Sequence, residues 1–284
     1  MQSSLRYLFM LGLAVLPAIA SAGVANDIPS CYAASQVGIP VPATELELFV
    51  LIDQTTPLDA DLQNSVRENV GRLVQPGSAF VISSFSSFGQ GRYLGILTAG
   101  TLERPITEKA RASTSVKALR NFDICMRGQL DYGRKAAAVA LNKALAGSGA
   151  ELAKSDVMAS LKEISGRVAQ STARNKVVFV VSDMLENSGI SSFYANRNVR
   201  TLDPAVEMKK AETARQLGDF SGARIFVLGA GLVQQGGKGN NKDSGVYRDP
   251  KAMAALRQFW EQYFTRSNAK LIEFGAPALL NPVK

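Results

Sequence analysis

LELFVLID at residues 46–53 is the stretch that decides the fold class of this 284-residue chain. It is an almost continuous apolar run, and it ends in an aspartate. Such runs are typical of a central strand that is buried on both faces of a parallel sheet. A second run of the same kind, KVVFVVSD at residues 176–183, also ends in aspartate. Together the two runs predict a parallel sheet whose carboxyl ends carry acidic side chains.

Predicted strands and helices alternate around these two runs. Further strands are expected at 79–85, 93–98, 223–229 and 270–274, and helices at 58–74, 134–146, 156–170, from 204 and from 250. This alternation predicts an α/β fold, with a doubly wound, mostly parallel sheet and helices on both faces. A glycine-containing turn at 89–91 makes 93–98 an antiparallel edge strand. Ligands of such sheets bind outside the carboxyl ends of the strands.

Three local features are also predicted between these elements. Thr56 is expected to cap the first helix, with Pro57 in its first turn. Residues 23–45 contain three prolines and little periodicity, which favours an extended lead-in. Residues 100–131 have no clear period and are expected to form a long surface connection.

The first 22 residues have the three parts of an export signal. Arg6 precedes an apolar stretch that runs from Tyr7 to Leu16, and small residues close the segment at Ala20-Ser21-Ala22. The stretch is shorter than the roughly 20 residues of a spanning helix. We therefore expect cleavage near Ala22 and a periplasmic or extracellular protein without a transmembrane segment; a retained anchor is the alternative. The domains would be signal peptide 1–22, lead-in 23–45, α/β domain 46–275 and tail 276–284.

Two cysteines, Cys31 and Cys125, fit an oxidising compartment. With no third cysteine to compete, we expect them to form a disulfide that tethers the N-terminal segment to the central part of the chain. Two unrelated buried thiols are the alternative. No CxxC redox motif and no four-cysteine zinc site is present in the sequence.

The chain contains no histidine, which excludes histidine-dependent hydrolases and histidine-ligated metals. Its net charge is +8, but Lys and Arg are scattered, and the longest basic run is Lys209-Lys210. Nucleic-acid-binding segments usually cluster their charge among aromatic residues. We therefore expect solvated surface charge and no specific nucleic-acid partner, although weak contact with lipid or nucleic acid stays open.

Oxygen-bearing side chains follow the two aspartate-terminated strands. Asp53, Thr55 and Thr56 come after the first, and Ser182 with Asp183 comes at the end of the second. Carboxylate and hydroxyl oxygens are the ligands that Mg²⁺ or Mn²⁺ prefers. The alternative is that they are ordinary strand-end and capping residues. Ser84 and Ser86, at the end of the strand at 79–85, would lie at the same edge.

A strand ending in Asp-x-Thr, a helix, and a later strand ending in Ser-Asp resemble the von Willebrand factor A family over roughly residues 45–275. The resemblance implies a metal-ion-dependent adhesion site in which Asp53 and Thr55 match the first two signature positions and Asp183 the later aspartate. Pro57, at the third position, has no ligand oxygen, so Thr56 would have to substitute for it. The family's site also uses a threonine from another loop, and no threonine of this sequence matches it. Asp131 lies near the place where that threonine would be expected.

Three functions fit these observations. The first is an exported protein-interaction module of the cell envelope, which binds another envelope or secreted protein and, in one version, a divalent metal. The second is a metal-dependent hydrolase of an anionic, phosphoester-type substrate, with Asp53 and Asp183 holding the ion. The third is a metal-free structural subunit of an envelope assembly. No complete catalytic set is recognisable in the sequence, which favours the interaction module.

Overall fold

The chain folds around one mixed sheet. The computed structural model describes residues 26–89, 92–149, 155–195, 198–233 and 249–284; the predicted signal peptide lies outside them. Six strands follow the order β3-β2-β1-β4-β7-β8, and only the β2–β3 pair is antiparallel. Their bounds are β1 Leu46–Asp53, β2 Ser78–Gly89, β3 Arg92–Thr101, β4 Asn175–Val181, β7 Ala223–Leu228 and β8 Ala269–Gly275. The predicted α/β fold class and the antiparallel edge strand are confirmed.

β1 and β4 are neighbours at the centre of the sheet, as their apolar sequences require. They pair in parallel from Leu46 opposite Asn175 to Ile52 opposite Val181. Every residue of β1 from Leu48 onward is buried. Consecutive side chains point to opposite faces, so each strand contributes to two separate hydrophobic clusters. The register also brings the carboxyl ends of both strands to one edge of the sheet.

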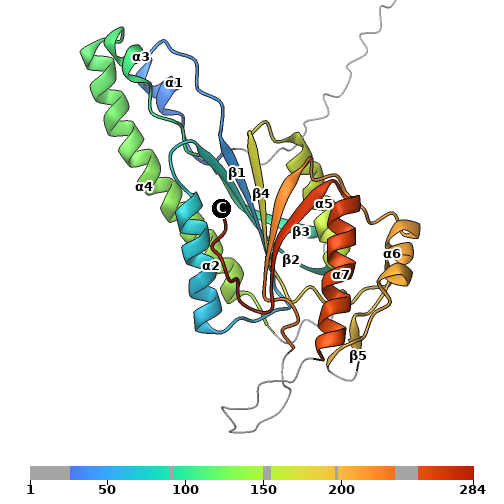
Figure 1. The fold of residues 1–284 in the computed structure, drawn as a ribbon. Helices are drawn as coiled ribbons and strands as arrows, with labels where there is room; N and C mark the ends of the chain where they lie inside the picture. Colours follow the sequence, from blue (N-terminus) through green and yellow to red (C-terminus); the bar gives the residue numbers. More distant parts are fainter. Residues whose placement is uncertain (1–25, 90–91, 150–154, 196–197, 234–248) are drawn as a thin grey trace, which may run out of the picture.

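Helices cover both faces of the sheet (Figure 1). One face packs against α2 Ala60–Leu73 and the C-terminal half of α4 Val116–Ala146. The other face packs against α5 Val157–Gln170, α6 Pro204–Thr213 and α7 Pro250–Arg266. α6 and α7 begin where the sequence predicts, and Asp203 and Asp249, each followed by proline, cap them. A short antiparallel pair, β5 Tyr194–Ala195 and β6 Asn198–Val199, completes the strands of the described residues.

Two local predictions are wrong at the start of α2 and in the lead-in. α2 begins after Asp59, whose side chain accepts a hydrogen bond from the Leu62 N–H at 2.8 Å. Thr56 is not the cap, because its hydroxyl accepts from the Asp183 N–H at 3.1 Å. The lead-in contains the short helix α1 Cys31–Ser35. The Thr56–Asp183 hydrogen bond and the disulfide of α1 join segments that are distant in sequence, and local patterns do not reveal them.

The predicted surface connection at 100–131 is wrong as well. Most of it is helical: α3 Glu108–Ala112 is followed by α4, which is one continuous helix of 31 residues. The N-terminal half of α4 projects beyond the sheet and packs only against α1, α3 and the segment between β3 and α3 (Figure 1). A helix with so small a buried face shows little periodicity, which is why the sequence pattern misses it.

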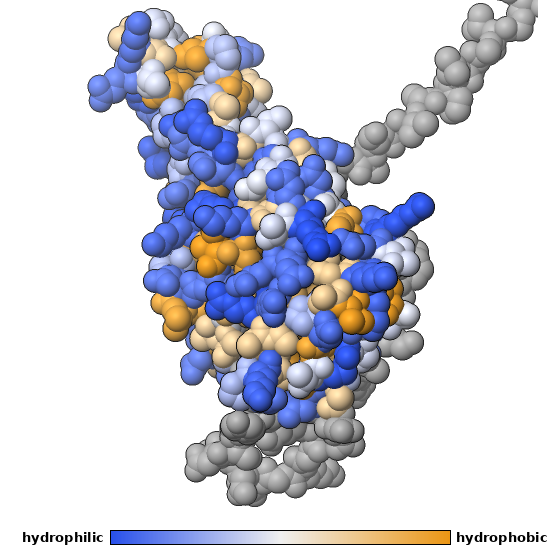
Figure 2. All heavy atoms as spheres, turned by 45° about the vertical axis from the view of Figure 1, so that its right-hand side comes forward, coloured by the Kyte–Doolittle hydropathy of each residue, from blue (hydrophilic) through white to orange (hydrophobic). Residues whose placement is uncertain are grey.

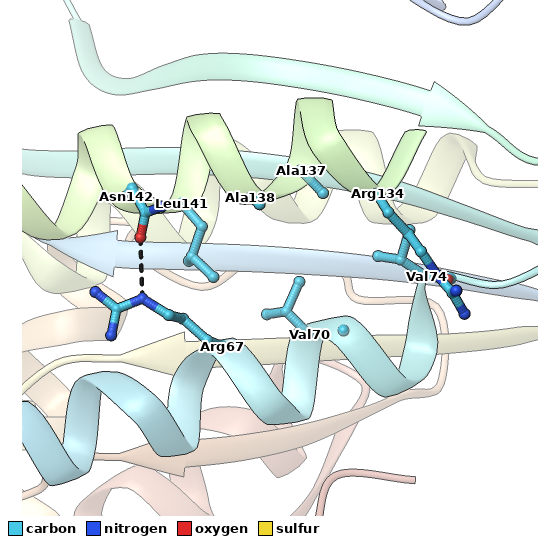
Figure 3. Close-up of a pocket in the computed structure, with 9 residues that line it drawn as sticks. Arg67, Val70, Val74, Arg134, Ala137, Ala138, Leu141 and Asn142 are labelled. Carbon is cyan, nitrogen blue, oxygen red and sulfur yellow. Dashed lines mark hydrogen bonds between the residues drawn. The ribbon is translucent and has the colours of Figure 1, made fainter. Parts of the chain in front are cut away.

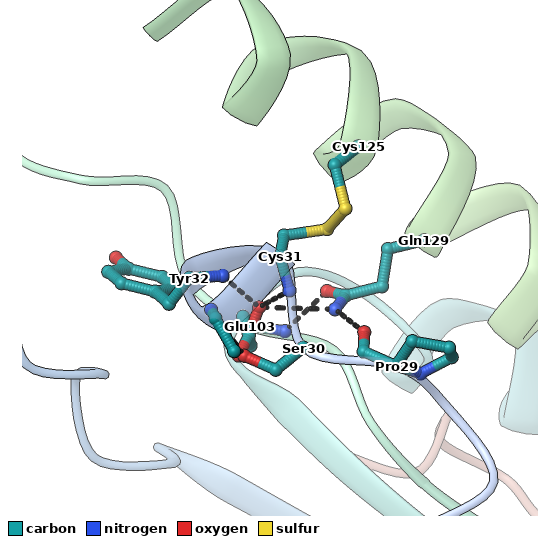
Figure 4. Close-up of a disulfide and its surroundings, with 8 residues drawn as sticks. Pro29, Ser30, Cys31, Tyr32, Glu103, Cys125 and Gln129 are labelled. Carbon is teal, nitrogen blue, oxygen red and sulfur yellow. Dashed lines mark hydrogen bonds between the residues drawn. A yellow bond between two sulfur atoms is a disulfide. The ribbon is translucent and has the colours of Figure 1, made fainter. Parts of the chain in front are cut away.

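We call α1, α3 and residues 116–130 of α4 the arm. It has a small core of its own, formed by Cys31, Tyr32, Val37, Ile106 and Phe122. The predicted disulfide between Cys31 and Cys125 is confirmed and joins α1 to α4 (Figure 4). Beneath it, the buried carboxylate of Glu103 accepts from the Ser30 hydroxyl and the Cys31 N–H. The arm is therefore held by a covalent link and a buried polar centre.

The C-terminal residues return to the sheet after β8. The Gly229 N–H donates to the Pro277 carbonyl, and the Val283 N–H donates to Asn69 Oδ1 of α2 at 2.8 Å. Val283 is 3% exposed and belongs to the cluster beneath α2. Among the described residues, no helix combines the length and the apolar character that crossing a membrane requires.

Candidate functional site

Asp53 is the centre of the predicted site and is completely buried. Its Oδ1 accepts from the N–H and the hydroxyl of Thr55, at 2.9 and 2.6 Å. Its Oδ2 accepts from the hydroxyls of Ser182 and Ser155, at 2.7 and 3.2 Å. These four donors come from the loop after β1, the end of β4 and the segment before α5. One carboxyl group thus ties together three parts of the carboxyl edge.

Asp183 lies beside Asp53 and is 2% exposed. Its Oδ1 accepts from the Leu185 N–H at 2.8 Å, and its Oδ2 accepts from the Tyr194 hydroxyl of β5. Met184, next along the chain, has a φ of 59° in the left-handed region, and its carbonyl accepts from the Trp260 indole at 2.9 Å. The turn after β4 is thus held by donors from β5 and α7.

Both aspartates have raised pKa values. Burial raises the pKa of Asp53, and its hydrogen bonds only partly offset that rise. Burial, followed by the nearby charge of Asp53, raises the pKa of Asp183 well above its ordinary range. Two carboxylates that lie close together repel each other when both are ionised and no cation lies between them. Retention of one proton removes this repulsion. The pair is therefore expected to retain a proton at a pH at which an exposed aspartate has lost its own.

The arrangement does not fit a divalent metal ion well. Both oxygens of Asp53, and both of Asp183, already accept hydrogen bonds from protein donors. Within the described ranges, no group of three or more Asp, Glu or Cys side chains could hold a metal. An ion would have to displace the Ser182 and Tyr194 donors, and Pro57 offers no side-chain oxygen in exchange. The carboxyl pair is satisfied by the protein itself.

Other predicted residues are distributed unevenly. Ser84 and Ser86 are half-buried near the end of β2. Ser84 pairs with Ile52 across the sheet, so it does lie near the carboxyl edge. Asp131 does not lie near this edge, because it is exposed in the middle of α4. It precedes Gly147, the C-cap of that helix, by 16 residues, which corresponds to about 24 Å along the helix axis. The structure thus brings Asp53, Thr55, Thr56, Ser182 and Asp183 together and leaves Asp131 apart.

The sequence reading missed two members of this site, Ser155 and Tyr194. Ser155 precedes α5, and Tyr194 belongs to a two-residue strand. Burial and the charge of Asp183 raise the pKa of Tyr194, so its hydroxyl remains a donor. Neither residue has a motif of its own; only the spacing of the folded elements places it against an aspartate.

Glu186 is a further buried carboxyl that the sequence did not indicate. It is 1% exposed, and its Oε2 accepts from the Met158 N–H in the first turn of α5 at 2.9 Å. Its Oε1 has no hydrogen-bond partner. Burial raises the pKa of Glu186 to about 7. The protonation of this side chain therefore changes near neutral pH.

Hydrophobic residues are spread evenly over the visible surface of the protein (Figure 2). Figure 2 shows hydrophilic and hydrophobic residues interspersed over the visible face, with the hydrophobic ones in small separate groups. Scattered apolar residues of this kind are normal on a globular protein, whereas binding patches are broader. This face therefore offers no broad apolar docking patch.

Comparison with known proteins gives only distant likenesses. No protein-family model and no curated protein matches this chain. One similar solved structure is an aerotolerance-related membrane protein from Bacteroides fragilis NCTC 9343, with 12% identity, 81% of this chain and 92% of that chain covered, and a TM-score of 0.35. Another is the pilus adhesin SpaC from Lactobacillus rhamnosus GG in an open conformation, with 13% identity, 82% and 28% coverage, and a TM-score of 0.39. Likenesses this distant assign no function.

Proposed function

We propose that this chain is an exported, von Willebrand factor A-like interaction module of the cell envelope. Its partner, another envelope or secreted protein, would bind the loops at the carboxyl edge of the sheet. The observation that carries this proposal is the Asp53–Asp183 network, which joins three separate loops into one unit. Export is supported by the sequence of residues 1–22 and by the disulfide, since disulfides persist in oxidising compartments.

A network of this kind favours binding because it fixes loops in advance. A loop that is already ordered loses little conformational entropy when a partner binds. The Asp53 network holds the loop after β1, while Asp183 and Tyr194 hold the segment that includes Ser188 and Gly189. Gly189 is exposed at the surface of this segment. The edge would therefore present a preformed surface.

The same network supports metal-independent binding. The two carboxyls are satisfied by hydroxyl and amide donors, so the surface needs no ion to keep its shape. We expect Mg²⁺ or Mn²⁺ to leave the melting temperature unchanged. A rise with either ion that Asp53→Asn abolishes would contradict this and would favour the metal-binding version, in which Asp53, Thr55, Thr56 and Asp183 hold the ion.

The interaction role is tested by changing the surface without changing the core. Gly189→Arg adds a long side chain at the carboxyl edge, and Gly166→Arg adds the same side chain on α5. A Cβ would meet open space at both positions, and both glycines are exposed. Cross-linking in native envelopes, followed by mass spectrometry, should give one partner with the wild type and the Gly166 variant, and none with the Gly189 variant. Equal capture by both variants would refute binding at this edge.

A further inference from the structure

A second surface lies on α4, far from the carboxyl edge. Positions 116, 120, 123, 127, 130, 134, 137 and 141 follow alternating spacings of four and three residues. Such positions form one stripe along an α-helix. The C-terminal part of this stripe faces α2, and its N-terminal part lies on the arm. Because α4 has 31 residues, it is about 46 Å long, and its two ends are well separated.

At the C-terminal end, the stripe is covered by α2. Val70 of α2 and Val74 just after it face Ala137 and Leu141 of α4 across a shallow groove of about 190 Å³ (Figure 3). Arg67 closes one end of the groove by donating to Asn142 Oδ1 at 2.9 Å. At the other end, Arg134 donates to the Val74 carbonyl at 3.2 Å. The last residue of α2 is Leu73, so the cover stops near Arg134.

On the arm, the same stripe is open. A hollow of about 570 Å³ runs along the surface of α4, and Arg120 and Arg127 are among the residues that line it. Val116 is 83% exposed and Ile124 54% exposed beside them. α1 packs against another side of this half of α4, and α3 borders the hollow through Arg111. No helix of the described chain continues the line of α2 over it.

Three arginines give the stripe positive charge between positions 120 and 134. Arg120, Arg127 and Arg134 lie seven residues apart, about 10 Å for each step. Among the described residues, none of the three forms an ion pair. The one carboxylate in the hollow, Asp123, is engaged by Arg111 through two hydrogen bonds at 2.8 and 2.7 Å. Arg111 also lowers the pKa of Asp123, which keeps this pair ionised.

We propose that the arm binds an acidic amphipathic helix of a partner protein. The helix would lie along α4 and continue the line of α2, with its carboxylates against Arg120 and Arg127 and its apolar side chains against Val116 and Ile124. A second copy of this chain is disfavoured because each copy carries a net charge of +8. A lipid surface is disfavoured because only two strongly exposed apolar side chains flank the arginines, too few for an interfacial helix.

The disulfide gives this surface its rigidity. Cys125 faces α1 and lies on the same helix as Ile124 and Arg127. The Cys31–Cys125 link therefore fixes the N-terminal half of α4, which does not pack against the sheet. A rigid arm presents its arginines in one arrangement, which lowers the entropic cost of binding.

The test uses a fluorescent synthetic helix with glutamates seven residues apart and leucines between them, and the full mature protein. Anisotropy should show saturable binding that weakens with salt. Arg120→Glu with Arg127→Glu should weaken it by about tenfold or more, since close charge pairs across an interface couple strongly. Lys209→Glu with Lys270→Glu changes the charge equally on other elements and should have little effect.

Three outcomes would overturn the proposal: no saturable binding, equal loss in both double variants, or equal binding of a scrambled peptide. Arg120→Gln with Arg127→Gln should give a smaller loss and guards against misfolding, which circular dichroism checks in each variant. Vesicles with anionic lipid are tested separately. Binding to the vesicles and not to the peptide would identify a lipid surface and contradict the proposal. None of these results depends on Gly189 or the carboxyl edge, so this proposal and the proposed function can fail separately.

Discussion

Asp53, Asp183 and Glu186 are carboxyl groups that the fold removes from water. Asp53 has four donors and Asp183 two, whereas one oxygen of Glu186 has none. Burial favours the neutral form of a carboxyl, and hydrogen bonds to the charged form oppose that effect. One oxygen of Glu186 is therefore uncompensated, and ionisation of this side chain near neutral pH lowers the stability of the folded state.

Glu186→Gln should remove part of the pH dependence of stability. The folded-state pKa of about 7 exceeds the ordinary 4.5, so between these values the folded chain keeps a proton that the unfolded chain releases. The free energy of unfolding of the wild type should therefore fall as pH rises through this window, by about 3 kcal/mol from this group. Urea titrations at several pH values should show a flatter profile for the variant, and greater stability than the wild type at pH values above the window.

Glu163→Gln is the matched control for this substitution. Glu163 lies on α5 and is exposed, so its change should leave the profile of stability against pH as it is in the wild type. If Glu186→Gln has the same slope as the wild type, the carboxyl of Glu186 is ionised at little cost, and its burial has less effect than inferred. Slope that remains in the variant comes from the other groups with shifted pKa values, including Asp53 and Asp183, whose values burial also raises.

Among the elements, α4 shows how one helix can serve two environments. Its C-terminal half packs against the sheet and α2, and its N-terminal half packs only against α1, α3 and the segment between β3 and α3. Glu103 accepts from Ser30, Cys31 and Tyr32 of the α1 segment and from Gln129 of α4. This buried polar centre and the disulfide replace the apolar contacts that a short, exposed helical segment lacks.

Cys31→Ala with Cys125→Ala should loosen the arm selectively. The link joins α1 to α4, so its removal leaves the arm held by its small core and by Glu103. Hydrogen exchange should become faster in α1, α3 and residues 116–130, with little change in β1 and β4. Reduction of the wild type should reproduce this pattern. Uniformly faster exchange across the central strands would contradict a local role.

In the molecule as a whole, the C-terminal residues complete the core on the α2 side of the sheet. Val283 is buried against the cluster that contains β1, β4 and α2, although it is the second-last residue. Its N–H donates to Asn69, whose side chain is also buried. The tail therefore connects the last strand to the first long helix and closes the chain across the sheet (Figure 1).

Val283→Ala should lower the free energy of unfolding by about 1–2 kcal/mol, since it removes buried methyl groups and leaves a small cavity. Leu280→Ala is the control, because Leu280 is 92% exposed and its truncation removes no core contact. Chemical denaturation of the two variants should separate them clearly. Equal stabilities would mean that the tail does not remain docked in solution.

The sequence alone determined the sheet and much of its edge. Continuous apolar runs can only be accommodated where both faces are buried, so β1 and β4 were predictable, and with them the meeting of Asp53 with Asp183 at the carboxyl edge. The Asp-Pro starts of α6 and α7 were equally predictable, because capping depends on neighbours in the chain. With two cysteines, only one intramolecular pair was possible.

Only the tertiary structure decided what lies against those aspartates and how far α4 extends. Tyr194 and Ser155 donate to the carboxyls from segments without a motif, and the Asp183 N–H takes the Thr56 hydroxyl that the sequence assigned to a helix cap. The N-terminal half of α4 is held by the disulfide and by Glu103, contacts that are distant in sequence. Local patterns record the preference of a segment for a conformation and for burial; the partner that satisfies a buried polar group is fixed only when distant segments pack together.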